Sequence, residues 1–134
     1  MIVADVNLLV YLFVRGPWTS FAEAALVRDP VWVTPPLYRY ELLNVMATNI
    51  RAGVLTIDQA KRIMEEIERT VRVVADPDRT EVLRTSVASR LATFDCEYVV
   101  LAGTLGTRIV TADKGILSRF RDNAISIEDF AAGH

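Results

Sequence analysis

The chain has 134 residues, of which 51% are hydrophobic and 24% are charged, and its formal net charge is −2 at pH 7. This length suits one domain over residues 1–134 with a single core, and the composition excludes a disordered chain. No apolar run approaches the ~20 residues of a membrane-spanning helix. The run Val3 to Val14 lacks a positively charged start, which argues against a signal peptide. The single cysteine, Cys96, excludes an internal disulfide, and we expect a cytoplasmic protein.

Short apolar runs alternate with helical patterns in the first half of the chain. Thr56 and Gln59 have the spacing of a capping box, and Gly53 fits the end of the helix before it. Thr19 or Ser20 is expected to cap an earlier helix. The expected elements are a strand at Ile2–Ala4, helices at Asn7–Val14 and Thr19–Arg28, a strand at Val31–Val33, a helix from Thr34 to Ala52 and a helix from Thr56 to Arg69.

The second half continues the alternation. The expected elements are a strand at Val71–Val74, helices from Asp76 to Leu91 and Asp95 to Leu105, a strand at Arg108–Ala112, a helix at Lys114–Arg121 and a strand at Ile125–Ile127. Strands separated by helices pair in parallel through right-handed crossovers. We therefore expect an α/β fold, a three-layer α/β/α sandwich around a central, mainly parallel sheet.

Two aspartates directly follow expected strands. Asp5 comes after Ile2–Ala4, and Asp113 comes after Arg108–Ala112. In open parallel sheets, ligands bind outside the carboxyl ends of the strands, so both carboxylates are expected at that edge. The alternative is that each aspartate serves only as the N-cap of the next helix, where aspartate is favoured.

Two further acidic residues are expected near the same edge. Glu41 falls within an apolar helical stripe that begins at Leu37, where a carboxylate is unfavourable unless it is paired or binds a metal. Asn44, one turn along, is expected to orient Glu41, and a salt-bridged surface glutamate is the alternative. Asp95 precedes the helical run Cys96 to Leu105, where it either joins the other acids or caps that helix.

Four carboxylates in one crevice repel one another unless cations neutralise them. Magnesium and manganese prefer oxygen ligands, and such sites assist phosphodiester hydrolysis by activating water and clamping the phosphate. The only histidine, His134, is the last residue, so histidine acid–base catalysis is disfavoured. If the four acids are neutralised, the rest of the chain is net positive. The overall charge therefore does not exclude a nucleic-acid partner.

Ordered motifs cover nearly the whole chain. They are Ile2-Val3-Ala4-Asp5-Val6-Asn7, then Glu41 in the helix after the second strand, then Phe94-Asp95-Cys96 with Leu101-Ala102 and Leu105-Gly106, and finally Ile109-Val110-Thr111-Ala112-Asp113. Each motif alone is weak, but the set at this spacing is specific. It resembles the PIN-domain nucleases, and in particular the VapC-type toxins of toxin–antitoxin pairs.

This resemblance implies a ribonuclease that uses magnesium or manganese to hydrolyse RNA and leaves 5′-phosphate and 3′-hydroxyl ends. It also implies a homodimer and a cognate antitoxin that inhibits the enzyme. The implied catalytic and metal-binding residues are Asp5, Glu41, Asp95 and Asp113, with Asn7 and Thr111 as supporting polar groups. From the sequence alone, Thr111 is equally well explained as an ordinary β-branched strand residue.

Other functions fit the sequence less well. A receiver-type phosphoacceptor domain has a pair of acids after the first strand, whereas Val6 follows Asp5. A haloacid-dehalogenase-like phosphatase has Asp-x-Asp there, whereas this chain has Asp5-Val6-Asn7. A housekeeping PIN-domain nuclease for RNA processing, without an antitoxin, is the remaining alternative. A PIN-like protein that acts only by binding is disfavoured because all four acids are present.

Overall fold

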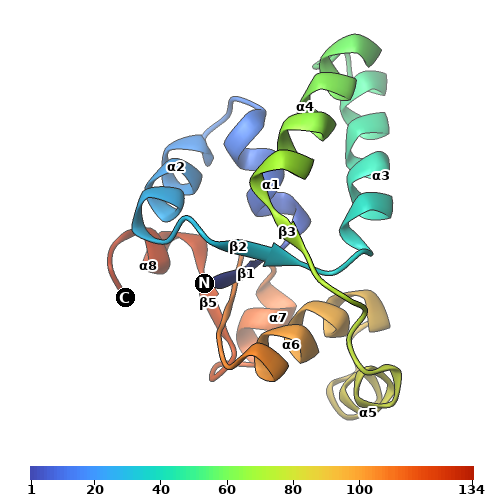
Figure 1. Ribbon diagram of the computed structural model, residues 1–134, viewed down its shortest axis with the longest axis vertical. Helices are drawn as coiled ribbons and strands as arrows, with labels where there is room; N and C mark the ends of the chain where they lie inside the picture. Colours follow the sequence, from blue (N-terminus) through green and yellow to red (C-terminus); the bar gives the residue numbers. More distant parts are fainter.

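A computed structural model describes all 134 residues of the chain. Five strands form one fully parallel sheet in the order β3-β2-β1-β4-β5 (Figure 1). They are β1 (Ile2–Ala4), β2 (Trp32–Thr34), β3 (Arg72–Val73), β4 (Ile109–Thr111) and β5 (Ala124–Ser126). The expected α/β class with a central parallel sheet is confirmed.

Eight helices connect and cover the strands. They are α1 (Val6–Phe13), α2 (Thr19–Arg28), α3 (Tyr38–Arg51), α4 (Ile57–Thr70), α5 (Arg79–Ser89), α6 (Thr93–Leu105), α7 (Lys114–Arg119) and α8 (Ile127–Ala131). None of them combines the length and the apolar character that crossing a membrane requires.

The two faces of the sheet pack against different helices because side chains alternate along each strand. Ala4 and Trp32 belong to the larger core with residues of α1, α2, α3, α4 and α8. Val3 and Val33 belong to a second core with residues of α6 and α7. Helix α5 packs on α6, farther from the sheet. In Figure 1, α1, α3 and α4 accordingly lie above the strands, and α5, α6 and α7 lie below them.

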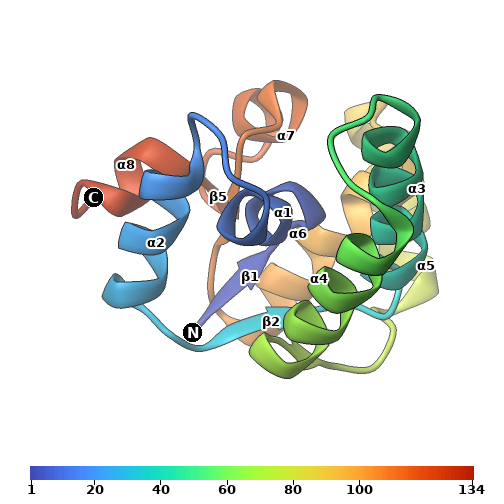
Figure 2. The ribbon, with the colours of Figure 1, turned by 90° about the horizontal axis from the view of Figure 1, so that it is seen from above.

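The strand order fixes where a ligand can bind. From β1 the chain builds β2 and β3 on one side, then returns to place β4 and β5 on the other. The order therefore reverses between β1 and β4, and parallel sheets bind ligands in the crevice outside the carboxyl ends of the strands at such a point. Helix α1 leaves the carboxyl end of β1 at the centre of the molecule (Figure 2).

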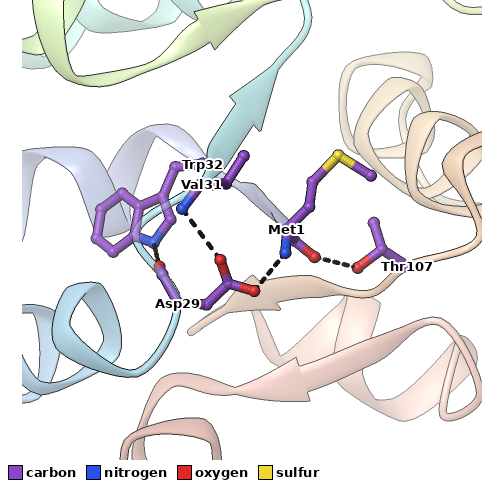
Figure 3. Close-up of polar contacts among 5 residues, drawn as sticks. All are labelled: Met1, Asp29, Val31, Trp32 and Thr107. Carbon is purple, nitrogen blue, oxygen red and sulfur yellow. Dashed lines mark hydrogen bonds and ion pairs between the residues drawn. The ribbon is translucent and has the colours of Figure 1, made fainter.

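Hydrogen bonds fix the opposite, amino-terminal edge of the sheet (Figure 3). The amino group of Met1 forms an ion pair with Asp29, whose carboxylate also accepts the N–H of Val31 at 3.0 Å. Trp32 Nε1 donates to the Asp29 carbonyl at 2.8 Å, and Thr107 Oγ1 donates to the Met1 carbonyl at 2.6 Å. These bonds join the starts of β1 and β2 to the loop before β4. They fix the register of these strands, and the register determines where the carboxyl ends of the strands lie.

The ends of several elements differ from the sequence expectation. The capping box of Thr56 and Gln59 at the start of α4 is confirmed. The cap predicted for α2 is wrong, because Thr19 is buried and its hydroxyl bonds the preceding loop at Gly16 and Val14 instead. The sequence analysis also missed α8, which begins immediately after β5 with Ser126 as its N-cap.

Candidate active site

Asp5 and Asp113 meet at the carboxyl ends of β1 and β4 through the hydroxyl of Thr111. Thr111 Oγ1 donates to Asp5 Oδ2 and accepts the backbone N–H of Asp113 at 3.0 Å. Asp5 is only 6% exposed and Thr111 is fully buried. A buried hydroxyl bonded on both sides has one orientation, so Thr111 fixes the spacing of the two aspartates.

Each of these aspartates also caps a helix. Asp5 Oδ1 accepts the N–H of Leu8 at the start of α1, and Asp113 Oδ1 accepts the N–H of Ile116 at the start of α7, both at 2.9 Å. The N-cap alternative is therefore correct as far as it goes. Helix capping occupies one oxygen of each carboxylate, and the same backbone geometry holds both side chains at the strand ends.

Glu41 reaches the site from the first turn of α3 and is half-buried. Its Oε1 accepts a hydrogen bond of 2.5 Å from the phenol of Tyr98 on α6, and Tyr98 is only 3% exposed. The orienting group is thus Tyr98, whereas the sequence analysis named Asn44, which is exposed.

The face of α3 that packs on the core also differs from the expected stripe. Its buried residues are Tyr38, Leu42 and Met46, at a spacing of four, whereas Tyr40 is 74% exposed. Glu41 lies next to this buried face, at its border. A carboxylate at this border keeps part of its solvation, and the Tyr98 hydroxyl compensates for the part that is lost.

Asp95 lies inside the first turn of α6, because the helix begins at Thr93 with Ala92 as its N-cap. Asp95 therefore does not cap the helix, and no side-chain or backbone hydrogen bond perturbs the pKa of its half-buried carboxyl. Phe94, the residue before it, is 57% exposed. Of the four acids, Asp95 is the one whose carboxylate is least committed to other protein groups.

The four carboxylates act on one another electrostatically. Burial, together with the negative charges of Glu41 and Asp113, raises the pKa of Asp5 to about 6. Burial and the charge of Asp95 raise the pKa of Glu41, and burial and the charge of Asp113 raise the pKa of Asp95. These pairs close a ring in which every acid has two of the others as neighbours. Such clusters of perturbed carboxyls are typical of functional sites.

The side chains as they stand do not form a closed cage. No group of three or more His, Cys, Asp or Glu side chains is arranged to hold a metal ion directly. The donor chemistry nevertheless suits magnesium or manganese, because all four groups offer hard oxygen ligands. Magnesium usually keeps several waters and takes only one or two carboxylates directly, so an open ring of this kind fits it.

Two other polar residues differ in how closely they join the site. Asn7 is exposed in the first turn of α1, and its supporting role stays a prediction. Thr34, at the carboxyl end of β2, is fully buried near Tyr98, and its hydroxyl oxygen has no hydrogen-bond partner. The sequence analysis missed both Thr34 and Tyr98. The spacing of three between Asp95 and Tyr98 was the available signal, because such residues share a helix face.

The sequence of this chain matches a known family. The segment from residue 2 to residue 123 matches the family model of the PIN domain. The chain belongs to the PIN domain family. All four acidic residues lie within the matched segment of this PIN domain.

Two curated relatives come from Pyrobaculum aerophilum. Ribonuclease VapC3 is 27% identical over 123 residues, which cover 89% of this PIN-domain chain and 94% of that protein. Exonuclease VapC9 is 30% identical over 89 residues, which cover 66% of each chain.

Two solved structures share the PIN-domain fold of this chain. The crystal structure of PAE2754 from Pyrobaculum aerophilum has a TM-score of 0.79 and 24% identity, and the match covers 97% of this chain and 85% of that one. A toxin–antitoxin complex from Klebsiella pneumoniae has a TM-score of 0.72 and 15% identity, covering 95% of this chain and 98% of that one.

Proposed function

We propose that this PIN domain is a metal-dependent endoribonuclease and the toxin of a toxin–antitoxin pair. The observation that carries the proposal is the ring of Asp5, Glu41, Asp95 and Asp113 at the point where the strand order reverses. Similarity to Ribonuclease VapC3 along nearly the whole chain supports cleavage of RNA. The fold shared with a toxin–antitoxin complex favours a toxin over a housekeeping RNA-processing nuclease.

Each acidic residue has a distinct part in the proposed site. Asp5 and Asp113 are held at a fixed spacing by Thr111, and Tyr98 orients Glu41. Asp95, free of other bonds, can turn toward a ligand. These four residues would hold magnesium or manganese, which when bound would activate water and stabilise the phosphate during hydrolysis. In the apo protein the pKa of Asp5 is raised mainly by burial and further by the charges of Glu41 and Asp113, and a bound cation would favour its charged form.

Apolar surface near α1 to α4 supports the proposed protein partners. The rings of Tyr11 and Trp18 stack with centroids 5.7 Å apart, and Trp18 and Phe21 follow at 5.8 Å. Leu43 and Ile57 are exposed on α3 and α4. We propose a homodimer in which α1–α2 and α3–α4 frame the groove for the antitoxin. We place the protein in the cytoplasm, since its one cysteine is buried and unpaired.

The products of cleavage test the proposed chemistry. Water-driven hydrolysis assisted by a divalent cation is expected to leave 5′-phosphate and 3′-hydroxyl ends on RNA. The ends can be read by labelling the fragments with polynucleotide kinase before and after phosphatase treatment, using total RNA and manganese. Fragments with 2′,3′-cyclic phosphates would contradict the proposal, because they arise when the ribose hydroxyl attacks in place of water.

The bond between Tyr98 and Glu41 gives a second expected result. Tyr98→Phe keeps the ring and removes only the hydroxyl, so the fold is retained while Glu41 loses its orienting donor. Loss of such a supporting bond lowers metal affinity by about 10–100-fold. Calorimetric titration with manganese measures this change.

Tyr40→Phe is the matched control, because Tyr40 lies on the same helix as Glu41 but is exposed. It is expected to bind manganese as the wild type does. Equal manganese affinities for Tyr98→Phe and the wild type would show that Tyr98 has no part in the site.

A further inference from the structure

The cavity between α5 and α7 differs in charge from two other cavities of the molecule. It has a volume of about 590 Å³ and is lined by Arg84, Thr85, Ala88, Ser89, Arg119 and Phe120, with no acidic residue. Of the other two, the cavity at α5 and α6 contains Asp76 and Glu97, and the one on α4 contains Asp58 and Glu65. Two guanidinium groups without an acid in the lining favour an anionic ligand.

Arg119 is positioned to present its guanidinium to this cavity. Its Nε donates to the backbone carbonyl of Ser89 at 2.9 Å, which ties α7 to the end of α5. Arg119 forms none of the ion pairs of the chain, so its two terminal nitrogens remain available. Arg84 pairs with Glu81 at the surface, and an exposed pair of this kind contributes little and exchanges readily. Guanidinium groups bind phosphate through two donors at once.

Gly115 connects this cavity to the acidic ring. A Cβ atom placed on Gly115 would lie 3.1 Å from Asp113 Oδ1 and 3.9 Å from Arg119 Nη1. Asp113 and Arg119 therefore border the same glycine, together with Leu91, whose Cδ2 would lie 3.2 Å from the same Cβ position. A strand of nucleic acid that leaves the acidic ring past Gly115 would reach Leu91 and the Arg119 guanidinium on the way to this cavity. The half-buried ring of Phe120 lies in the same cavity, and nucleic-acid bases stack on such rings.

We propose that this cavity is a subsite for the RNA strand, where Arg119 and Arg84 bind a phosphate adjacent to the one that is cleaved and Phe120 contacts the attached base. The inference rests on the proposed ribonuclease function and adds to it the direction in which the substrate crosses the surface. Because the two arginines recognise a phosphate, their contacts do not depend on the base sequence of the RNA.

Binding of a single-stranded RNA in the absence of cleavage tests the subsite. A fluorescent 2′-O-methyl oligonucleotide is titrated in EDTA, so that neither catalysis nor a bound cation contributes. Arg119→Gln is expected to weaken binding by roughly tenfold or more, the scale for loss of a charged hydrogen bond. The slope of log affinity against log salt is expected to become shallower by ~0.7 for each phosphate that the variant no longer neutralises.

Two further variants distinguish a loss of RNA binding from a loss of folding. Arg84→Gln removes an exposed side chain whose one ion pair is with Glu81, and it is expected to weaken binding severalfold with an unchanged melting temperature. Arg62→Gln, an exposed arginine in the cavity on α4, is the matched control and is expected to bind as the wild type does.

Several results would overturn the subsite. These are unchanged affinity and salt slope in both Arg119→Gln and Arg84→Gln, or displacement of the RNA by polyglutamate at a lower concentration than by unlabelled RNA. The latter would assign the cavity to an acidic protein segment. Failure of the ribonuclease proposal is a separate outcome, namely a wild-type protein that binds the oligonucleotide through these arginines but cleaves no RNA with manganese.

Discussion

Replacing Asp95 by asparagine lowers the rate of RNA cleavage by about two orders of magnitude or more, the scale for losing one strong electrostatic interaction with a transition state. Asp95 is the cleanest of the four acids to change. It caps no helix, and no hydrogen bond perturbs the pKa of its carboxyl, so asparagine keeps the shape and removes only charge. Initial rates on a fluorogenic RNA with manganese measure the effect, and circular dichroism checks the fold.

The matched control is Asp122→Asn, in the exposed turn between α7 and β5. It removes the same charge away from the ring and is expected to cleave RNA at the wild-type rate. Manganese should also raise the melting temperature of the wild type and of this control more than that of Asp95→Asn, because a ligand that binds only the folded state stabilises it. Wild-type cleavage by Asp95→Asn would remove Asp95 from the active site.

The second large effect concerns the stability of the metal-free protein. Burial raises the pKa of Asp5 to about 6, from an ordinary value of 3.8. Because the folded state binds the proton more tightly than the unfolded state, protonation of Asp5 favours folding. This contribution is fully present below the unfolded pKa and is lost as the pH rises through the folded pKa. Its size is about 3 kcal/mol, at 1.36 kcal/mol for each pKa unit.

Asp5→Asn removes this titration. Asparagine is as good an N-cap as aspartate, so the start of α1 is retained. In EDTA, the free energy of unfolding of the variant relative to the wild type is therefore expected to rise by about 2.5 kcal/mol between pH 4 and pH 8, since at pH 4 the unfolded state is already partly deprotonated. Urea denaturation at several pH values measures the difference. Parallel pH curves for the two proteins, with the same offset throughout, would show that folding does not raise the pKa of Asp5.

The parts of the fold that the sequence predicted depend on local patterns. The strand at Ile2–Ala4 and the aspartate after it follow from an apolar run that ends in a charged residue, and the same pattern places Asp113 after β4. Since parallel strands align their carboxyl ends, the meeting of Asp5 and Asp113 follows from the fold class. The missed helix α8 had a signal in the spacing of Ser126 and Asp129, which resembles a helix start.

The parts that could not be predicted depend on packing between distant segments. Glu41 and Tyr98 are separated by 57 positions, and their bond requires α3 and α6 to meet across the carboxyl edge of the sheet. No local pattern encodes that meeting, and the apparent stripe around Glu41 pointed instead to Asn44. The link from Arg119 to Ser89 is of the same kind, with 30 positions between the two residues.

The measurement that tests the central claim most directly is cleavage of RNA by the wild-type protein in EDTA, followed by addition of excess manganese. If the ring of Asp5, Glu41, Asp95 and Asp113 works by holding a divalent cation, cleavage is absent in EDTA and returns when manganese is added. Cleavage at the full rate in EDTA would contradict the account, because the four carboxylates would then have no cation to hold and another group would have to activate the nucleophile.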